Sequence, residues 1–223
     1  IQFLLEQTTV DIEYLVVSYE SGDECIRIRF LNPGEGIWRI RVFNENALPG
    51  MFHIWLPIRN FISDSTYFLQ ANPDTTICDP ANNVGLISIA YYQSANNSIV
   101  SESGRGFARD GQIRPDIASP GIEVFGPLPA IGDLAGLTPE ERSQRARYGY
   151  LSGSSMACAV TAGAVALLVE WGFVRRNDIS MDTVTVQKYL IRGADRNGMT
   201  APNRTWGNGT LDLFGVFDAL RPK

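Results

Sequence analysis

The chain has 223 residues, of which 44% are hydrophobic and 19% charged, enough apolar material to bury a sizeable core in one large unit or two smaller ones. A net charge of -5, a pI near 5.0 and the lack of a dense cluster of Lys and Arg argue against a nucleic-acid-binding surface. Cys25, Cys78 and Cys158 include no Cys-x-x-Cys pair, so we expect free thiols and no zinc or redox site.

The sequence has neither the pattern of a membrane span nor that of a signal peptide. The apolar run after Ser155 ends at Glu170, about 15 residues on, whereas a bilayer requires about 20. The chain starts in mid-pattern, without an initiator Met or the layout of a signal peptide. We therefore expect a fragment or a processed piece of a longer protein.

Residues 1–70 have the pattern of an antiparallel β-sandwich. Apolar and polar residues alternate over residues 25–31, 36–43 and 51–56, and clusters of Gly, Pro, Asn and Asp separate these runs. Short strands at this spacing favour a sandwich of the jelly-roll kind. The only histidine, His53, lies in the third run, where we expect a structural side chain on the face of a strand.

From residue 71 to 223 the pattern changes to that of an α/β unit. Residues 84–92 form a nearly continuous apolar run, which is typical of a strand covered on both faces of a parallel sheet. Thr138, a Pro at the next position and two Glu residues after it predict a short exposed helix. A second, amphipathic helix is predicted over residues 180–193, capped by Ser180 and stopped at Gly193.

A central, buried helix is predicted from about Ser154 to Glu170. Its residues 156–169 carry no charge and place small side chains on every face, so it needs neighbours all round. Ser155 falls in the first turn, where backbone N–H groups lack intrahelical partners. A serine there serves either as a simple helix cap or as a nucleophile whose oxyanion is stabilised by the N–H groups and the helix dipole.

Four segments of the α/β part resemble landmarks of the subtilisin-like serine proteases. Gly-Ser-Ser-Met-Ala at residues 153–157 resembles the Gly-Thr-Ser-Met-Ala nucleophile segment, although Ala-Val follows at 159–160 where Pro-His is usual. The family's Ser-Ser-x-Gly loop, its Lys-Pro-Asp-Ile-x-Ala-Pro-Gly segment and its Trp-Gly-x-Gly-x-Leu-Asp segment are matched at residues 101–106, 114–124 and 206–212. The resemblance implies that Ser155 is the nucleophile and that Asp116, in the second of these segments, is structural.

The resemblance also implies a fold class. Residues 36–42 together with 55–59 resemble the β-sandwich insert of some clostridial-type subtilases. The expected architecture is therefore the C-terminal half of a subtilisin-like, parallel-sheet α/β domain over residues 71–223, with an antiparallel β-sandwich insert over residues 1–70.

A serine nucleophile requires a base to take its proton and a carboxylate to orient that base. Subtilases carry the Asp, the His and the oxyanion Asn before the Ser, and nothing upstream of Ser155 fits, because His53 lacks the Gly-His-Gly-Thr-His context. The N-terminal half of the same protein is expected to supply these groups, and this chain alone is expected to be inactive. The expected partner is a polypeptide substrate, with no cofactor, metal, nucleic acid or membrane.

Three functions are compatible with these observations. The first is a serine endopeptidase of the subtilisin type. The second is a non-catalytic pseudoprotease that acts as a binding or signalling protein, and only the N-terminal half would discriminate the two. A free-standing β-sandwich binding module is a third, which the α/β landmarks after residue 101 argue against.

Overall fold

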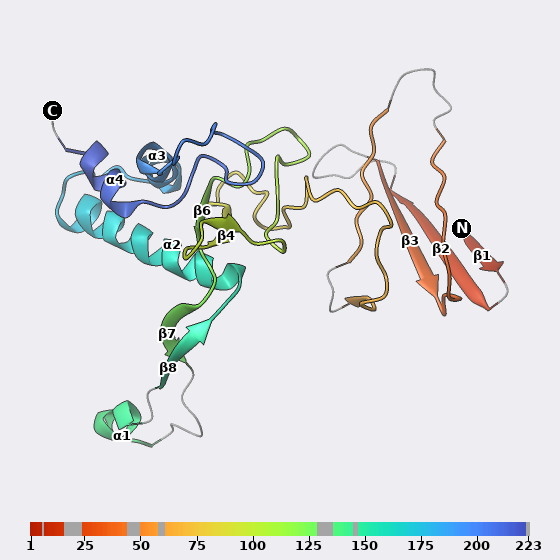
Figure 1. The fold of residues 1–223 in the computed structure, drawn as a ribbon, viewed down its shortest axis with the longest axis horizontal. Helices are drawn as coiled ribbons and strands as arrows, with labels where there is room; N and C mark the ends of the chain where they lie inside the picture. The colour runs from red at the N-terminus through yellow and green to blue at the C-terminus, as the bar shows by residue number, and fades with distance from the viewer. Residues whose placement is uncertain are drawn as a thin grey trace. The chain divides into compact units, whose positions relative to one another are not determined.

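The chain divides into two compact units, Ile1–Asp64 and Ser65–Lys223. Figure 1 shows the strands of the first unit in red and orange, and the helices and strands of the second from yellow-green to blue. The computed structural model describes residues 1–5, 7–15, 24–43, 50–57, 61–128, 136–144 and 147–221.

The first unit contains a three-stranded antiparallel sheet in the order β1-β2-β3. Its strands are β1 (Gln2–Leu5), β2 (Thr8–Leu15) and β3 (Cys25–Leu31). The alternation over residues 25–31 thus predicted a strand with the observed bounds. A cross-strand pair, Glu13 opposite Arg27, forms an exposed ion pair of 2.8 Å on β2 and β3.

The strands predicted over residues 36–43 and 51–56 are wrong, because neither segment forms a strand in the structure. Alternation specifies which side chains share a face, but a strand also needs a neighbour for its N–H and C=O groups. Most of these side chains are exposed, and Trp38 instead packs edge-on against Phe30 with 5.0 Å between ring centroids. The described part of this unit therefore forms one sheet.

The second unit is built on a small mixed sheet in the order β5-β4-β6. β4 (Ile89–Gln93) pairs in parallel with β6 (Ile117–Pro120), and the short β5 (Ser98–Ile99) pairs antiparallel with the end of β4. Only the second half of the predicted strand 84–92 is a strand. The Asn83 side chain accepts the Gly85 N–H at 2.8 Å, so a turn occupies the first half.

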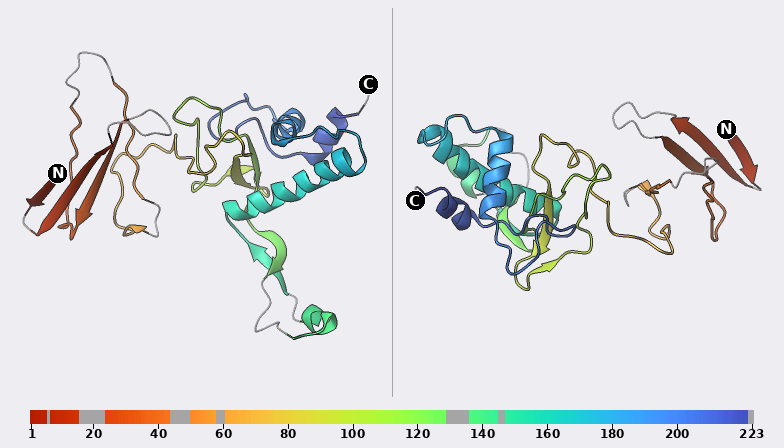
Figure 2. Two further views of the ribbon diagram at one scale, coloured as in Figure 1. Left: turned by 180° about the vertical axis from the view of Figure 1, so that it is seen from behind. Right: turned by 90° about the horizontal axis from the view of Figure 1, so that it is seen from above.

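Helix α2 (Ser154–Val169) packs against β4 and β6, and it continues as one π-helical turn, η2 (Glu170–Val174). The left view in Figure 2 shows α2 as the longest helix of the unit, beside the sheet. The predicted bounds of this helix are confirmed, but its burial is one-sided. Leu167 is 49% exposed, and the buried positions form a single stripe of four residues, Ala157, Thr161, Ala164 and Leu168.

Two further helices complete the hydrophobic core. In α3 (Thr183–Gly193), Asp182 rather than the predicted Ser180 is the N-cap, and it accepts the Thr185 N–H at 2.8 Å. α4 (Leu213–Ala219) crosses α3 so closely that a Cβ on Gly193 would overlap the backbone of Val216. The core beneath these helices consists of Ile117, Leu168, Met181, Val186, Leu190, Ala194 and Val216.

A two-stranded hairpin leads directly into α2. It pairs β7 (Val124–Leu128) with β8 (Arg147–Leu151), and between them lies α1 (Pro139–Gln144), the predicted short exposed helix. The Thr138 N–H donates to the Glu141 carboxylate at 2.8 Å, and the Glu141 N–H donates to the Thr138 hydroxyl at 3.3 Å. This reciprocal capping explains why the helix starts here.

The structure bears on the sequence-based expectations about a membrane span, the cysteines and a metal site. Helix α2 and η2 together span Ser154–Val174, 21 residues that include an 18-residue window with a mean hydropathy of 1.8. Among the described residues, this one helix therefore has the length and composition of a membrane span, as core helices of water-soluble proteins also do. The three cysteines are free and exposed. Over the described ranges, no group of three or more His, Cys, Asp or Glu side chains is arranged to hold a metal ion.

Candidate active site

Ser155 lies in the first turn of α2 and is exposed. The turn begins at Gly153, whose φ of 144° is strained for a side-chain-bearing residue, and the Gly153 N–H donates to the Gly121 carbonyl at 2.7 Å. The Met156 N–H donates back to the Gly153 carbonyl at 3.0 Å. The N–H of Ser155 belongs to the first turn and lacks an intrahelical acceptor, so it is available to an oxyanion.

The start of α2 lies beside the carboxyl end of the parallel strands. Gly121 directly follows β6, and its own N–H donates to the Tyr92 carbonyl at 3.0 Å. A Cβ on Gly121 would come within 2.9 Å of the Gly153 carbonyl oxygen, so the two segments approach closely because residue 121 has no side chain. In open α/β sheets this edge is where ligands bind.

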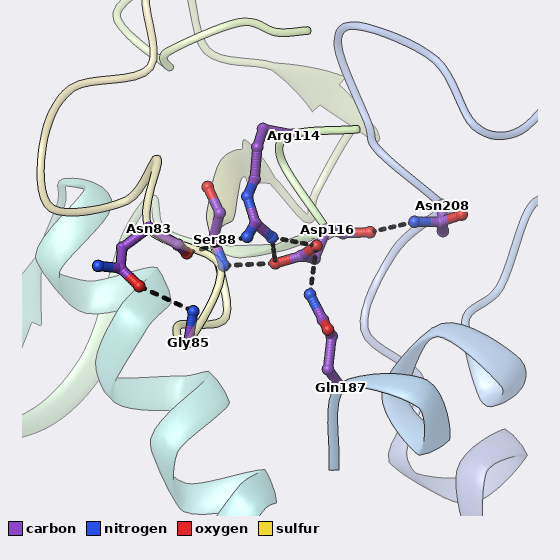
Figure 3. Close-up of polar contacts among 7 residues, drawn as sticks. All are labelled: Asn83, Gly85, Ser88, Arg114, Asp116, Gln187 and Asn208. Carbon is purple, nitrogen blue, oxygen red and sulfur yellow. Dashed lines mark hydrogen bonds and ion pairs between the residues drawn. The ribbon is translucent and has the colours of Figure 1, made fainter. Parts of the chain in front are cut away.

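Asp116, the residue directly before β6, is the centre of a buried polar network (Figure 3). Its carboxylate accepts the Ser88 N–H at 2.7 Å, both of its oxygens lie 2.6 Å from Nη1 of Arg114, and Gln187 of α3 donates to it at 2.7 Å. The Asn208 side-chain amide donates to its backbone carbonyl at 2.9 Å. The network therefore connects four parts of the unit: the residue before β4, the start of β6, helix α3 and the turn before α4.

Burial raises the pKa of the Asp116 carboxyl above its ordinary value, while the Ser88 N–H, Arg114 and Gln187 oppose that shift by favouring the charged form. The side chains of Asp116 and Arg114 are each 4% exposed. A carboxylate enclosed by three protein donors has no free face toward a substrate. This environment fits the structural role expected for Asp116.

The structure does not bring an imidazole to Ser155 within the second unit. His53 is the only histidine of the chain and belongs to the first unit, where it is half-buried and stacks on Trp55 at 5.3 Å between ring centroids. The described residues of the second unit thus supply a serine at a helix N-terminus without a base.

Sequence reasoning missed two parts of this region. Gln187 joins the Asp116 network from 71 residues away, and no local pattern distinguishes it from other polar residues of an amphipathic helix. The hairpin before Ser155 also carries clustered aromatic side chains. Phe125 lies 5.1 Å from Tyr150 and 6.0 Å from Tyr148 between ring centroids, and the alternation Tyr-Gly-Tyr at residues 148–150 was the available signal.

Comparison with known proteins gives three agreeing results. The Subtilase family model matches residues 60–209. The subtilisin-like protease SBT4.7 of Arabidopsis thaliana is 30% identical over 136 residues, which cover 58% of this chain and 18% of that protein. The structure of the Clostridium perfringens CspB protease superposes with a TM-score of 0.79 at 28% identity, and the match covers 99% of this chain and 44% of that one.

The chain thus spans less than half the length of these relatives. The match to the CspB structure includes both units of this chain. The fold is accordingly a partial subtilase-like fold, mixed α/β with parallel and antiparallel strands. The family match includes the sheet β4–β6, the Asp116 network and Ser155. On this evidence, the chain belongs to the subtilase family of serine proteases.

Proposed function

We propose that the whole protein is a serine endopeptidase of the subtilisin type and that Ser155 is its nucleophile. The observation that carries this proposal is the position of Ser155 in the first turn of α2, beside the carboxyl end of β6. There its hydroxyl would attack the scissile carbonyl, and its backbone N–H would donate to the oxygen that becomes negatively charged.

We further infer that the groups missing from this chain come from the N-terminal half of the same protein. Those groups are the His that takes the proton from Ser155, the Asp that orients it, and the Asn that shares the oxyanion. A helix N-terminus alone stabilises an adjacent charge by about 1 kcal/mol. In subtilisin, losing the His alone lowers kcat about 10⁶-fold, so this chain by itself is expected to be inactive.

The one-sided burial of α2 supports the same inference. Leu167 is half-exposed, and small uncharged residues on the part of the helix surface outside the buried stripe are exposed as well, among them Cys158, Ala162 and Ala166. A long apolar helix is stable when neighbours cover it on several sides. We propose that the second unit is the C-terminal half of a parallel-sheet catalytic domain, that the remainder of this domain covers α2, and that residues 1–70 form an antiparallel β-sandwich insert.

The experiment is to label the purified full-length parent protein with a fluorophosphonate, which reacts only with an activated serine. We expect labelling of the parent, its loss in Ser155→Ala, and no labelling of the isolated 223-residue chain. A folded parent that does not label would contradict the proposal and favour a pseudoprotease with a binding role. Labelling that survives in Ser155→Ala would assign the nucleophile to another residue.

A further inference from the structure

The hairpin that leads into α2 carries a cluster of three aromatic side chains on one face. Phe125 of β7 lies directly opposite Tyr150 of β8 in the antiparallel register, with 5.1 Å between ring centroids. Tyr148 is two residues from Tyr150, so both point to the same side, and its ring lies 6.0 Å from that of Phe125. We call these three residues the aromatic surface.

The aromatic surface is open to solvent. Phe125 is 61% exposed, Tyr148 64% and Tyr150 69%. The remaining strand residue on this face is Pro127, opposite Tyr148, so the face carries no charged group within the two strands. Contiguous exposed aromatic side chains are enriched at protein contacts and rare elsewhere on a surface.

The hairpin limits the distance between the aromatic surface and Ser155. Tyr150 precedes Ser155 by five residues, and five residues span at most about 18 Å. The base of the hairpin is held by two hydrogen bonds: the Glu123 N–H donates to the Ser152 hydroxyl at 2.9 Å, and the Gly153 N–H to the Gly121 carbonyl at 2.7 Å. An extended polypeptide advances about 3.3 Å per residue, so side chains within about five residues of the scissile bond can reach these rings.

The area favours a flexible peptide over a folded partner. A large aromatic side chain has about 150–250 Å² of surface, so three that are about two-thirds exposed offer roughly 300–500 Å². A stable protein–protein interface needs about 800 Å² on each partner. An apolar side chain or two of a bound polypeptide, in contrast, would be covered by this area.

We propose that the aromatic surface of Phe125, Tyr148 and Tyr150 is a specificity site that binds an apolar side chain of the polypeptide substrate within five residues of the scissile bond. This inference rests on the proposed role of Ser155. A substrate with an apolar residue at that position gains contact with the rings, and a substrate with a small polar residue there gains none.

The test uses the full-length protein and fluorogenic peptides that differ at one position, Leu or Ser, scanned over five residues on each side of the scissile bond. The readout is the ratio of kcat/KM for the Leu and Ser peptides at each position. In Phe125→Ser and in Tyr150→Ser, we expect this ratio to fall about tenfold at one position, whereas Tyr150→Phe should retain it. Phe214→Ser, which removes an exposed aromatic side chain from α4, is the matched control and should leave the ratio unchanged.

The outcomes separate the two proposals. If the wild-type protein is labelled by the fluorophosphonate but the ratio is unchanged in both serine variants, the aromatic surface is not a specificity site and the proposed function stands. An equal fall for all peptides, or a fall in melting temperature of about 10 °C or more, would show that these side chains support the structure instead. Absence of labelling in the wild-type protein would overturn both proposals.

Discussion

The buried pair of Arg114 and Asp116 allows a quantitative stability prediction. Asp116→Asn preserves the size of the side chain but removes its charge, so the Arg114 guanidinium, which is 4% exposed, loses its counter-ion. Breaking a buried ion pair from one side costs about 3–5 kcal/mol. The loss of one neutral hydrogen bond would cost only about 0.5–1.5 kcal/mol, so the unpaired charge dominates.

This cost should appear as a large shift in thermal stability. For a unit of 150–250 residues, each kcal/mol lowers the melting temperature by about 2–4 °C, so Asp116→Asn should lower it by about 6–20 °C. The matched control is Asp218→Asn, the same chemical change in an exposed pair with Arg221 at 3.4 Å. Exposed pairs contribute less than about 1 kcal/mol, so the control should shift the melting temperature by no more than about 4 °C.

The assay is differential scanning fluorimetry of the full-length parent, combined with fluorophosphonate labelling at 15 °C, where the variant is expected to be folded. Arg114→Met in the Asp116→Asn background removes the unpaired charge and should recover part of the lost stability. A melting temperature of Asp116→Asn within 2 °C of wild type would refute the energetic argument. Normal stability with abolished labelling would instead give Asp116 a catalytic role.

Three further outcomes are expected. Gly193→Ala should lower the melting temperature of the parent by several degrees, because its Cβ would overlap the Val216 backbone where α3 meets α4. Leu167→Ala should destabilise the full-length parent by more than about 1 kcal/mol in urea unfolding if the rest of the catalytic domain covers α2, whereas an exposed Leu would cost at most about 0.5 kcal/mol. The hydrogen bond from the Thr185 N–H lowers the pKa of Asp182, so its stabilising effect is present above pH 4 and lost as the pH falls through the lowered folded-state pKa. Asp182→Asn should therefore weaken the dependence of melting temperature on pH below about pH 4.

The elements predicted correctly from sequence have local signals. The Thr-Pro-Glu-Glu sequence at 138–141 contains the cap and the acidic first turn of α1, and the charge-free run after Ser154 specifies α2 to within one residue. In both cases the signal lies within the residues of the helix and its immediate flanks. The position of Ser155 at a helix N-terminus followed from the same local information.

The failures concern interactions with distant partners. Apolar and polar residues alternate over residues 36–43 just as they do over residues 25–31, but only residues 25–31 form a strand with a partner. Alternation in a sequence does not show whether a partner strand exists. At α3, both Ser180 and Asp182 are residues that cap helices, and the hydrogen bond to Thr185 distinguishes them only in three dimensions. The Asp116 network is non-local for the same reason.

In the central helix α2, the apolar composition and the observed burial disagree. Its charge-free sequence specifies neighbours on every side, yet only the stripe that includes Ala164 and Leu168 is buried, and Leu167 remains half-exposed. At about 25 cal/mol per Å² of apolar surface, a helix of 16 residues left in this state gives up several kcal/mol of possible stabilisation. A sequence keeps such a face apolar when something covers it in the functional protein. Under the proposed function, the part of the parent protein that covers α2 is also the part that supplies the base for Ser155, so stability and catalysis would depend on one interface.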